Sequence, residues 1–133
     1  MIGVIVTGHG NFASGMLSAV HLLAGETDFL QAVDFLPDES EDDLKAHLED
    51  ALDAVSGSSH VYVLCDLIGG SPFKMLYSLC RNREDVDILY GVNLPMVLDI
   101  SMRAMAEMDS AGMIERDSEE LLASGHEHMG KAK

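Results

Sequence analysis

Short apolar runs alternate along the chain with segments in which apolar residues recur every three or four positions. The apolar runs are rich in β-branched residues, which predicts strands at residues 2–7, 29–36, 60–65 and 86–90. The periodic segments predict helices that begin near residues 11, 40, 72 and 95. Strands and helices therefore alternate, and we expect residues 1–133 to form a single α/β domain.

Several residue types mark where the predicted helices begin. Asn11 is placed to cap the first helix, and Ser40 with Asp43 forms a weak capping box before the second. Pro72 suits the first turn of the third helix. The C-terminal part is less regular: Asp117 or Ser118 can cap a short helix that ends near Leu122. The last residues have the pattern of either a strand or a frayed tail.

Alternation of this kind predicts parallel strands joined by right-handed crossovers, with helices on both faces of the sheet. Four such units are too few to close a barrel, so we expect an open, doubly wound, mainly parallel sheet with strand order about 2-1-3-4. In sheets of this type the functional site lies beyond the carboxyl ends of the strands. The loops that follow Thr7, Cys65 and Tyr90 are therefore the candidate site.

Two of these loops carry residues that suit acid–base or nucleophilic chemistry. His9 stands between Gly8 and Gly10, where a helix begins. If the first and third strands are neighbours, Asp66 lies across from His9 and can fix the tautomer of its ring. Taken singly, a histidine in a turn is more often a solvated bystander, and an aspartate there is as often a turn or capping residue. Their shared position favours a functional pair.

The loop after the third strand has the features of an anion-binding cradle. Gly69 and Gly70 offer backbone amides, Ser71 offers a hydroxyl, and a helix begins at Pro72. A glycine pair alone is often only a turn. Beside His9 and Asp66, the segment predicts a site for an anion next to a nucleophile.

Composition restricts the partners of the chain. Its formal net charge is −15, whereas nucleic acids and anionic membrane surfaces require clustered Lys and Arg. No apolar run approaches the roughly 18 residues of a membrane span, and the N-terminus lacks the basic start of a signal peptide. Cys65 and Cys80 form no CxxC pair, so we expect two reduced, buried thiols. These features predict a cytoplasmic protein that binds no nucleic acid.

Other motifs of known chemistry are missing or weak. The sequence contains neither a GxxxxGK[ST] phosphate loop nor a GxGxxG motif. His126 and His128 flank Glu127, but two histidines in a tail are most often incidental, so we predict no metal site. The acidic segment at residues 38–53 is typical of a solvent-exposed helix face.

Three segments at the predicted site resemble a known family. They are VTGHG at residues 6–10, DLIGGSPF at residues 66–73 and GVNLPM at residues 91–96. These segments occur in the order found in the IIA component of the mannose-type sugar phosphotransferase system (PTS), and they resemble most closely its N-acetylgalactosamine-like branch. The resemblance extends over nearly the whole chain.

This resemblance implies a phosphoryl carrier that needs no cofactor. His9 would accept a phosphoryl group from the phosphorylated carrier protein HPr and pass it to a IIB component for sugar uptake. Asp66 would orient His9, and Ser71 would lie in the phosphate pocket. We predict that the rest of the phosphate or partner pocket is formed by Gly8, Gly10, Asn11, Leu67, Gly69, Gly70, Pro72, Asn93, Pro95 and Met96.

The resemblance also implies a homodimer, in which an antiparallel C-terminal strand swaps between subunits. The membrane components IIC and IID would be reached only indirectly, through IIB. Lys74 departs from the family pattern, because many members carry asparagine after Gly-Gly-Ser-Pro-Phe. A lysine there could place a cation near the phosphate or point to solvent, and it bears on partner preference.

Two other functions compete with sugar transport. A IIA-like subunit of a dihydroxyacetone kinase relay shares the fold, but the segments at residues 69–73 and 91–95 favour the sugar system. A non-catalytic phospho-sensor or a flavodoxin-like binding module is the second alternative. A flavin site requires aromatic stacking, and the chain has four Phe, three Tyr and no Trp.

Overall fold

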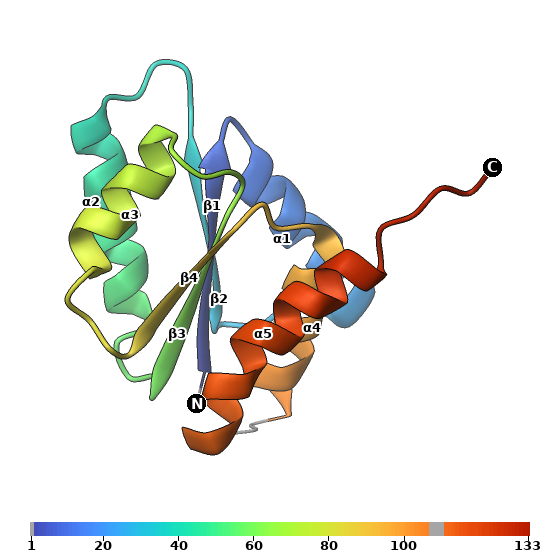
Figure 1. Cartoon of the computed structure of the whole chain (residues 1–133). Coiled ribbons are helices and arrows are strands. Elements are labelled where there is room, and N and C mark those ends of the chain that lie inside the picture. The colour runs from blue at the N-terminus through green and yellow to red at the C-terminus, as the bar shows by residue number, and fades with distance from the viewer. Residues whose placement is uncertain (1, 107–110) are drawn as a thin grey trace.

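The computed structural model describes residues 2–106 and 111–133. The strands within them are β1 (Ile2–His9), β2 (Leu30–Phe35), β3 (His60–Cys65) and β4 (Val86–Tyr90). The helices are α1 (Phe12–Ala24), α2 (Glu41–Ala54), α3 (Ser71–Cys80), α4 (Leu94–Met105) and α5 (Ala111–Glu127). These strands pair in parallel in the order β2-β1-β3-β4, which confirms the expected open, doubly wound sheet (Figure 1).

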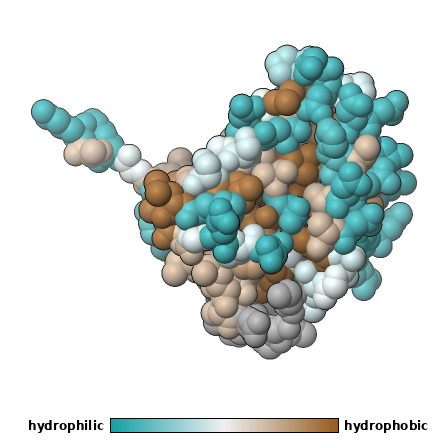
Figure 2. Space-filling view, turned by 180° about the vertical axis from the view of Figure 1, so that it is seen from behind, coloured by the Kyte–Doolittle hydropathy of each residue, from teal (hydrophilic) through white to brown (hydrophobic). Residues whose placement is uncertain are grey.

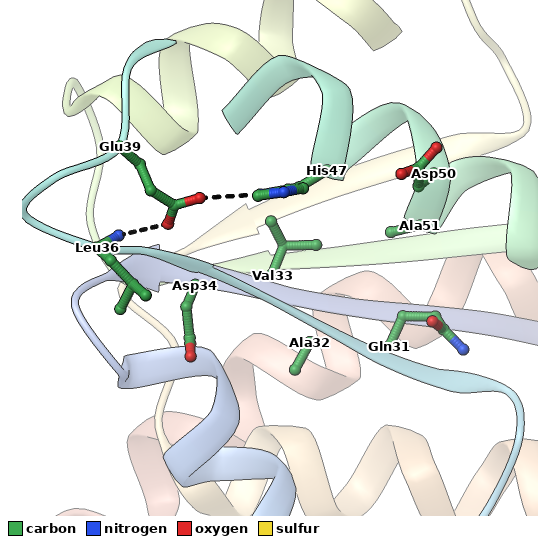
Figure 3. A pocket seen from close by; sticks show the side chains of 9 residues that line it. All are labelled: Gln31, Ala32, Val33, Asp34, Leu36, Glu39, His47, Asp50 and Ala51. Atoms are coloured by element: carbon green, nitrogen blue, oxygen red, sulfur yellow. Dashed lines mark hydrogen bonds and ion pairs between the residues drawn. The ribbon is translucent and has the colours of Figure 1, made fainter. Parts of the chain in front are cut away.

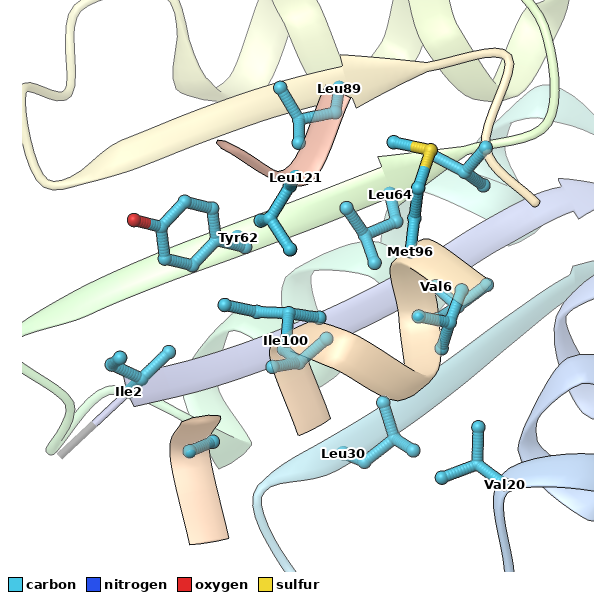
Figure 4. Packing of buried hydrophobic residues seen from close by; sticks show 14 of the residues in the cluster. Ile2, Val6, Val20, Leu30, Tyr62, Leu64, Leu89, Met96, Ile100 and Leu121 are labelled. Carbon is cyan, nitrogen blue, oxygen red and sulfur yellow. The ribbon is translucent and has the colours of Figure 1, made fainter. Parts of the chain in front are cut away.

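The sheet separates two apolar layers, and the strand period of two decides which residue enters which layer. On β3, Tyr62 and Leu64 pack with α1, α4 and α5, as Figure 4 shows in close-up. Val61 and Val63 face the other way and pack with α2 and α3. β3 is buried along its whole length, as a central parallel strand covered on both faces should be. Both faces are therefore sealed, and only the strand ends are available for chemistry.

The start of α1 differs from the prediction in how it is capped. Asn11 precedes the helix, but its side chain makes no capping hydrogen bond. Instead, the Asp34 carboxylate at the end of β2 accepts the backbone N–H of Ser14 at 2.9 Å. The cap thus comes from a neighbouring strand, which local sequence cannot reveal. The predicted Ser40–Asp43 capping box, whose partners are close in sequence, is confirmed.

The C-terminal segment also differs from the prediction. A short helix capped by Asp117 or Ser118 is wrong, because α5 runs from Ala111 to Glu127 and both residues lie inside it. Tertiary packing explains its length: Leu121 is fully buried, and Gly125 lies so close to Met96 that an added Cβ would be 2.5 Å from the sulfur. In a single chain residues 129–133 form no strand and run away from the body (Figure 1). A strand swap needs a second chain and stays a prediction.

The surface is divided between hydrophilic and hydrophobic regions. Seen from behind, the side formed by α2 is hydrophilic, whereas hydrophobic residues gather in the middle and toward the side from which the C-terminal tail projects (Figure 2). Exposed apolar side chains on α1 and α4 include Leu22, Leu23, Met102 and Met105. Within the described residues, no helix combines the length and apolar character that a bilayer crossing requires.

Candidate functional site

His9 and Asp66 meet where β1 and β3 end. The strands are paired in register up to Thr7 and Cys65, and the Asp66 N–H continues the pairing by donating to the Thr7 carbonyl at 3.2 Å. One carboxylate oxygen, Oδ2, then accepts the His9 backbone N–H at 2.9 Å and lies 2.7 Å from the ring nitrogen Nδ1. The structure therefore brings together the two residues that the sequence suggested as a pair.

The Asp66 carboxylate is held through both of its oxygens. Oδ1 accepts the Leu67 backbone N–H at 2.8 Å, so the group cannot rotate without losing bonds. Partial burial opposes ionisation of Asp66, but hydrogen bonds from the His9 backbone, the His9 ring and the Leu67 backbone outweigh it, and its pKa is lowered. An ionised carboxylate only accepts, so Nδ1 carries the ring hydrogen. In the neutral form of the ring, the second nitrogen, Nε2, then has a lone pair.

Glycine at position 8 permits this arrangement. A Cβ added to Gly8 would lie 2.8 Å from Asp66 Cγ and 2.7 Å from the Phe12 ring. Such distances are too short for real carbon atoms, so any side chain here would displace the carboxylate or the helix. Gly10 has φ +58°, a left-handed conformation that turns the chain from β1 toward α1. Gly8 therefore allows the close approach of Asp66, and Gly10 allows the turn from β1 into α1.

The glycine pair before α3 faces the histidine ring. Gly69 has φ +87°, and a Cβ on Gly70 would lie 2.5 Å from Cε1 and 2.9 Å from Nε2 of His9. Gly70 is the N-cap of α3, and within the described residues no side chain caps that helix. The first N–H groups of a helix lack intrahelical partners. The free edge of the His9 ring thus lies beside an uncapped helix start, an arrangement suited to anions.

Ser71 is the first residue of α3, and its hydroxyl is engaged elsewhere. It donates to Glu41 Oε1, at the start of α2, across 3.2 Å. Pro72 follows and is buried in the first turn of α3. Ser71 thus stands next to the residue that contacts His9, but its hydrogen bond points toward α2. Its predicted place in a phosphate pocket is untested.

The predicted pocket residues of the third loop face a different part of the molecule. Asn93 accepts the Met96 N–H at 3.2 Å and donates to the Gly125 carbonyl at 2.9 Å, which ties α4 to α5. Met96 is buried beneath α5. Pro95 lines a cavity of about 470 Å³ together with Leu23. Within the described residues, no hydrogen bond joins these three positions to His9 or Asp66.

The family of this chain follows from comparison with known proteins. The family model described as "PTS system fructose IIA component", EIIA-man, matches residues 3–116. A fructose-specific EIIA component of Bacillus subtilis is 30% identical over 135 residues, covering 100% of this chain and 92% of the relative. The chain belongs to the EIIA-man family.

Further relatives agree with this assignment. The mannose-specific EIIAB component of Escherichia coli is 29% identical over 101 residues, which cover 76% of this chain but only 31% of that longer protein. The crystal structure of an EIIA component from Streptococcus agalactiae superposes with a TM-score of 0.84 at 28% identity and covers 98% of this chain and 97% of its own. The relatives named here are fructose- and mannose-specific, so the N-acetylgalactosamine-like branch stays a prediction.

Exposed apolar side chains lie at the same edge of the sheet as the histidine of this EIIA-man family member. His9 is 47% exposed whereas Asp66 is 12% exposed, so the ring can be approached while its partner is shielded. Leu67 and Ile68 are exposed in the same loop, and so is Tyr90 at the end of the neighbouring β4. Tyr90 packs edge-on against Phe73 of α3, with ring centroids 5.9 Å apart. This edge of the sheet thus carries exposed apolar side chains of the kind that suits contact with another protein.

A separate cavity, of about 380 Å³, lies between β2 and α2 (Figure 3). It holds a second histidine–carboxylate pair, in which His47 Nδ1 lies 3.1 Å from Glu39 Oε2. Asp34 and Asp50 also line it, so its charge disfavours an anion. The described part of the chain contains no group of three or more His, Cys, Asp or Glu side chains placed to hold a metal ion.

Sequence reasoning missed the second layer of contacts around the site. Glu41 was interpreted as part of a solvated acidic face, yet it binds Ser71. Asp34, from the end of β2, accepts the Ser14 N–H in the first turn of α1. Both cysteines are buried and unpaired, as predicted. Burial, and then the nearby Asp66 charge, raise the pKa of the Cys65 thiol to about 12, so it stays protonated.

Proposed function

We propose that this chain carries phosphoryl groups on His9, taking them from phosphorylated HPr and giving them to a IIB component. EIIA components of the PTS are phosphotransferases, and the proposal assigns the transfer to one atom. The observation that carries it is the orientation of the His9 ring. Nδ1 is held by Asp66, whereas Nε2 is free and faces the glycine loop at the start of α3.

In the accepting step, the lone pair of His9 Nε2 attacks the phosphorus of a phosphohistidine on HPr. The P–N bond of the donor breaks in line, and its electron pair returns to the donor nitrogen. The His9 ring gains positive charge as the new N–P bond forms. The ionised Asp66, bonded to Nδ1, stabilises that charge and keeps the ring in position. No proton has to leave Nδ1 during the transfer.

The start of α3 supplies donors for the transferred group. The phosphoryl oxygens carry negative charge throughout the transfer. The first N–H groups of α3, which lack intrahelical partners, follow Gly70, the glycine that lies against the Nε2 edge of His9. The partial positive charge of the helix N-terminus adds to them. The Ser71 hydroxyl becomes a further donor once it turns away from Glu41. Transfer to IIB is the same reaction in reverse, with a IIB nucleophile attacking the phosphorus and His9 leaving.

The exposed Leu67, Ile68 and Tyr90, which lie at the same edge of the sheet as His9, support docking through apolar contacts. Because the chain has a net charge of −15, we infer that HPr and IIB contribute the basic groups at the contact. Raising salt should then slow association more than it slows chemistry.

The homodimer belongs to the same proposal. Leu22 and Leu23 of α1 and Met102 and Met105 of α4 expose apolar surface on one side of the molecule, and a further cavity of about 450 Å³ lies among these helices. Such a surface favours a protein–protein contact. Light scattering after gel filtration should give twice the mass of one chain, and Leu23→Glu should shift it toward the monomer. If the wild-type chain is monomeric, the homodimer is refuted, but the proposed transfer chemistry is not affected.

Intact mass spectrometry tests the central proposal. The chain is incubated with phosphoenolpyruvate, enzyme I and HPr, with His9→Ala and His47→Ala as matched variants. We expect one acid-labile phosphoryl group on the wild type and on His47→Ala, and none on His9→Ala. Addition of a IIB component should then discharge the phosphorylated chain. If wild type gains no mass, the proposal is wrong. If it is phosphorylated but never discharged by a IIB, it is a phospho-sensor instead.

A further inference from the structure

The starts of α2 and α3 lie side by side, and one side-chain contact joins them. Glu41 is the first residue of α2 and Ser71 the first residue of α3, and these two helices pack against each other on one face of the sheet (Figure 1). Ser71 donates its hydroxyl hydrogen to Glu41 Oε1 across 3.2 Å. Ser71 follows Gly70, whose backbone touches the Nε2 edge of His9. A carboxylate thus holds the hydroxyl of the residue that directly follows the glycine lying against the His9 ring.

A serine hydroxyl has a single hydrogen to donate. It can point to the Glu41 carboxylate or to an oxygen of a phosphoryl group on His9, but not to both. When it turns to the phosphoryl group, Glu41 loses its donor and its negative charge stays near a second negative group. Glu41 and the phosphoryl group therefore compete for Ser71.

We propose that Glu41 is a positioning residue that withdraws the Ser71 hydroxyl from phosphorylated His9 and so makes the phosphoryl group easier to give away. This inference rests on the proposed function. Glu41 does not touch the reacting atoms: it acts through Ser71, and its effect appears in the equilibrium between HPr and this chain. A carrier benefits from this device, because a phosphoryl group held too firmly would not pass to IIB.

The test measures that equilibrium. Phosphorylated HPr, freed of enzyme I, is mixed with an equal amount of the chain, and the phosphorylated fraction of each protein is read by intact mass. In Glu41→Gln the side-chain amide can donate to Ser71 Oγ, which leaves the serine hydrogen for the phosphoryl group. We expect the equilibrium constant to move about 3–10-fold toward the phosphorylated chain, the effect of about one hydrogen bond. Spontaneous loss of the phosphoryl group should slow as well.

Asp42→Asn is the matched control, because it removes the same charge from the next residue of α2, and Asp42 has no hydrogen bond to Ser71. We expect Asp42→Asn to resemble wild type. The double variant Glu41→Gln with Ser71→Ala should behave like Ser71→Ala alone, because the effect passes through the hydroxyl. Thermal unfolding confirms that each variant is folded.

Three results would overturn the inference. If Glu41→Gln and Asp42→Asn shift the equilibrium equally, net charge alone explains the effect. If Glu41→Gln keeps its full effect in the Ser71→Ala background, Ser71 does not transmit it. If wild type accepts the phosphoryl group and Glu41→Gln gives the same equilibrium, the competition does not exist. A wild type that accepts none would instead refute the proposed function together with this inference.

Discussion

In the described part of the chain, two histidine–carboxylate pairs have nearly the same form, because the ring nitrogen Nδ1 faces the carboxylate in each. His9 lies 2.7 Å from Asp66, with the ring 47% exposed and the carboxylate 12% exposed. His47 lies 3.1 Å from Glu39, with 52% and 16% exposure. In both pairs Nδ1 faces the carboxylate, and about half of the histidine side chain is exposed. A histidine–carboxylate pair by itself therefore does not identify a phosphoryl acceptor.

The surroundings of the two pairs differ. His9 is the last residue of a central strand and is flanked by glycines, with the uncapped start of α3 against its free nitrogen. His47 lies within α2 beside Asp50, in a cavity lined by several carboxylates (Figure 3). The surroundings of His9 offer hydrogen-bond donors to an anion, whereas the surroundings of His47 present negative charge. We infer that donors near the free nitrogen, and not the pair itself, distinguish the proposed acceptor site.

The sharpest test of this comparison replaces each histidine in turn. His9→Gln should abolish phosphorylation by HPr, because no nucleophilic nitrogen remains at the site. His47→Gln should change the rate less than about 2-fold, as for a surface substitution with an effect below about 0.5 kcal/mol. Radiolabel transfer from phosphoenolpyruvate measures both. Equal losses in the two variants would contradict the assignment of the site.

The second test removes the carboxylate of each pair. Asp66→Asn should slow phosphoryl acceptance about 100-fold, because the ring loses the partner that fixes its tautomer and stabilises its charge. Glu39→Gln should leave acceptance near the wild-type rate. Rapid-quench kinetics at saturating HPr separate the transfer step from docking. An unchanged rate in Asp66→Asn would mean that Asp66 serves only the loop structure.

The third test closes the space beside the ring. Gly70 has φ −77°, so alanine suits its backbone, but the new Cβ would lie 2.5 Å from His9 Cε1. The ring must move, and we expect acceptance to fall about 10–100-fold, as for a displacement of about 1 Å. Gly15→Ala is the control: it lies within α1 and a Cβ there meets nothing within 4 Å. Gly15→Ala should keep the wild-type rate and gain up to about 1 kcal/mol of stability.

The smallest expected effect is on acid stability. The lowered pKa of Asp66 means that its bonds stabilise the folded chain above the ordinary aspartate pKa of about 3.9. That stabilisation should disappear as the pH falls through the lowered pKa. Urea unfolding of wild type and Asp66→Asn between pH 6 and pH 2 should show a difference in free energy that shrinks toward acid. If the difference in unfolding free energy is the same at every pH, the charge of Asp66 does not contribute to stability.

The predictions from sequence succeeded where the interacting residues are close in the chain or follow a simple period. The alternation of strands and helices, the sheet order and the Ser40–Asp43 capping box depend on such patterns. His9 and Asp66 are 57 residues apart, yet they could be paired, because parallel neighbouring strands bring their carboxyl ends to one edge. The sheet topology therefore makes it possible to predict a contact between two residues that are far apart in the sequence.

Other features depended on contacts that no local pattern encodes. Asp34 replaces Asn11 as the cap of α1 because β2 ends beside that helix. Asn93 is drawn to the Gly125 carbonyl because α5 packs over α4, and the length of α5 depends on buried contacts such as Leu121. Each of these contacts involves a group with several possible partners in the sequence, so the sequence alone could not identify the actual partner.

The sequence by itself determined the type of fold, the two loops that meet at the candidate site, and the pairing of His9 with Asp66. Tertiary structure decided which ring nitrogen is free, which glycine lies against it, and that Glu41 holds Ser71. The physical reason is the separation along the chain of the residues that interact. Periodicity and turn chemistry are properties of neighbours in the chain, whereas the direction of a hydrogen bond between two elements is fixed only when they have packed.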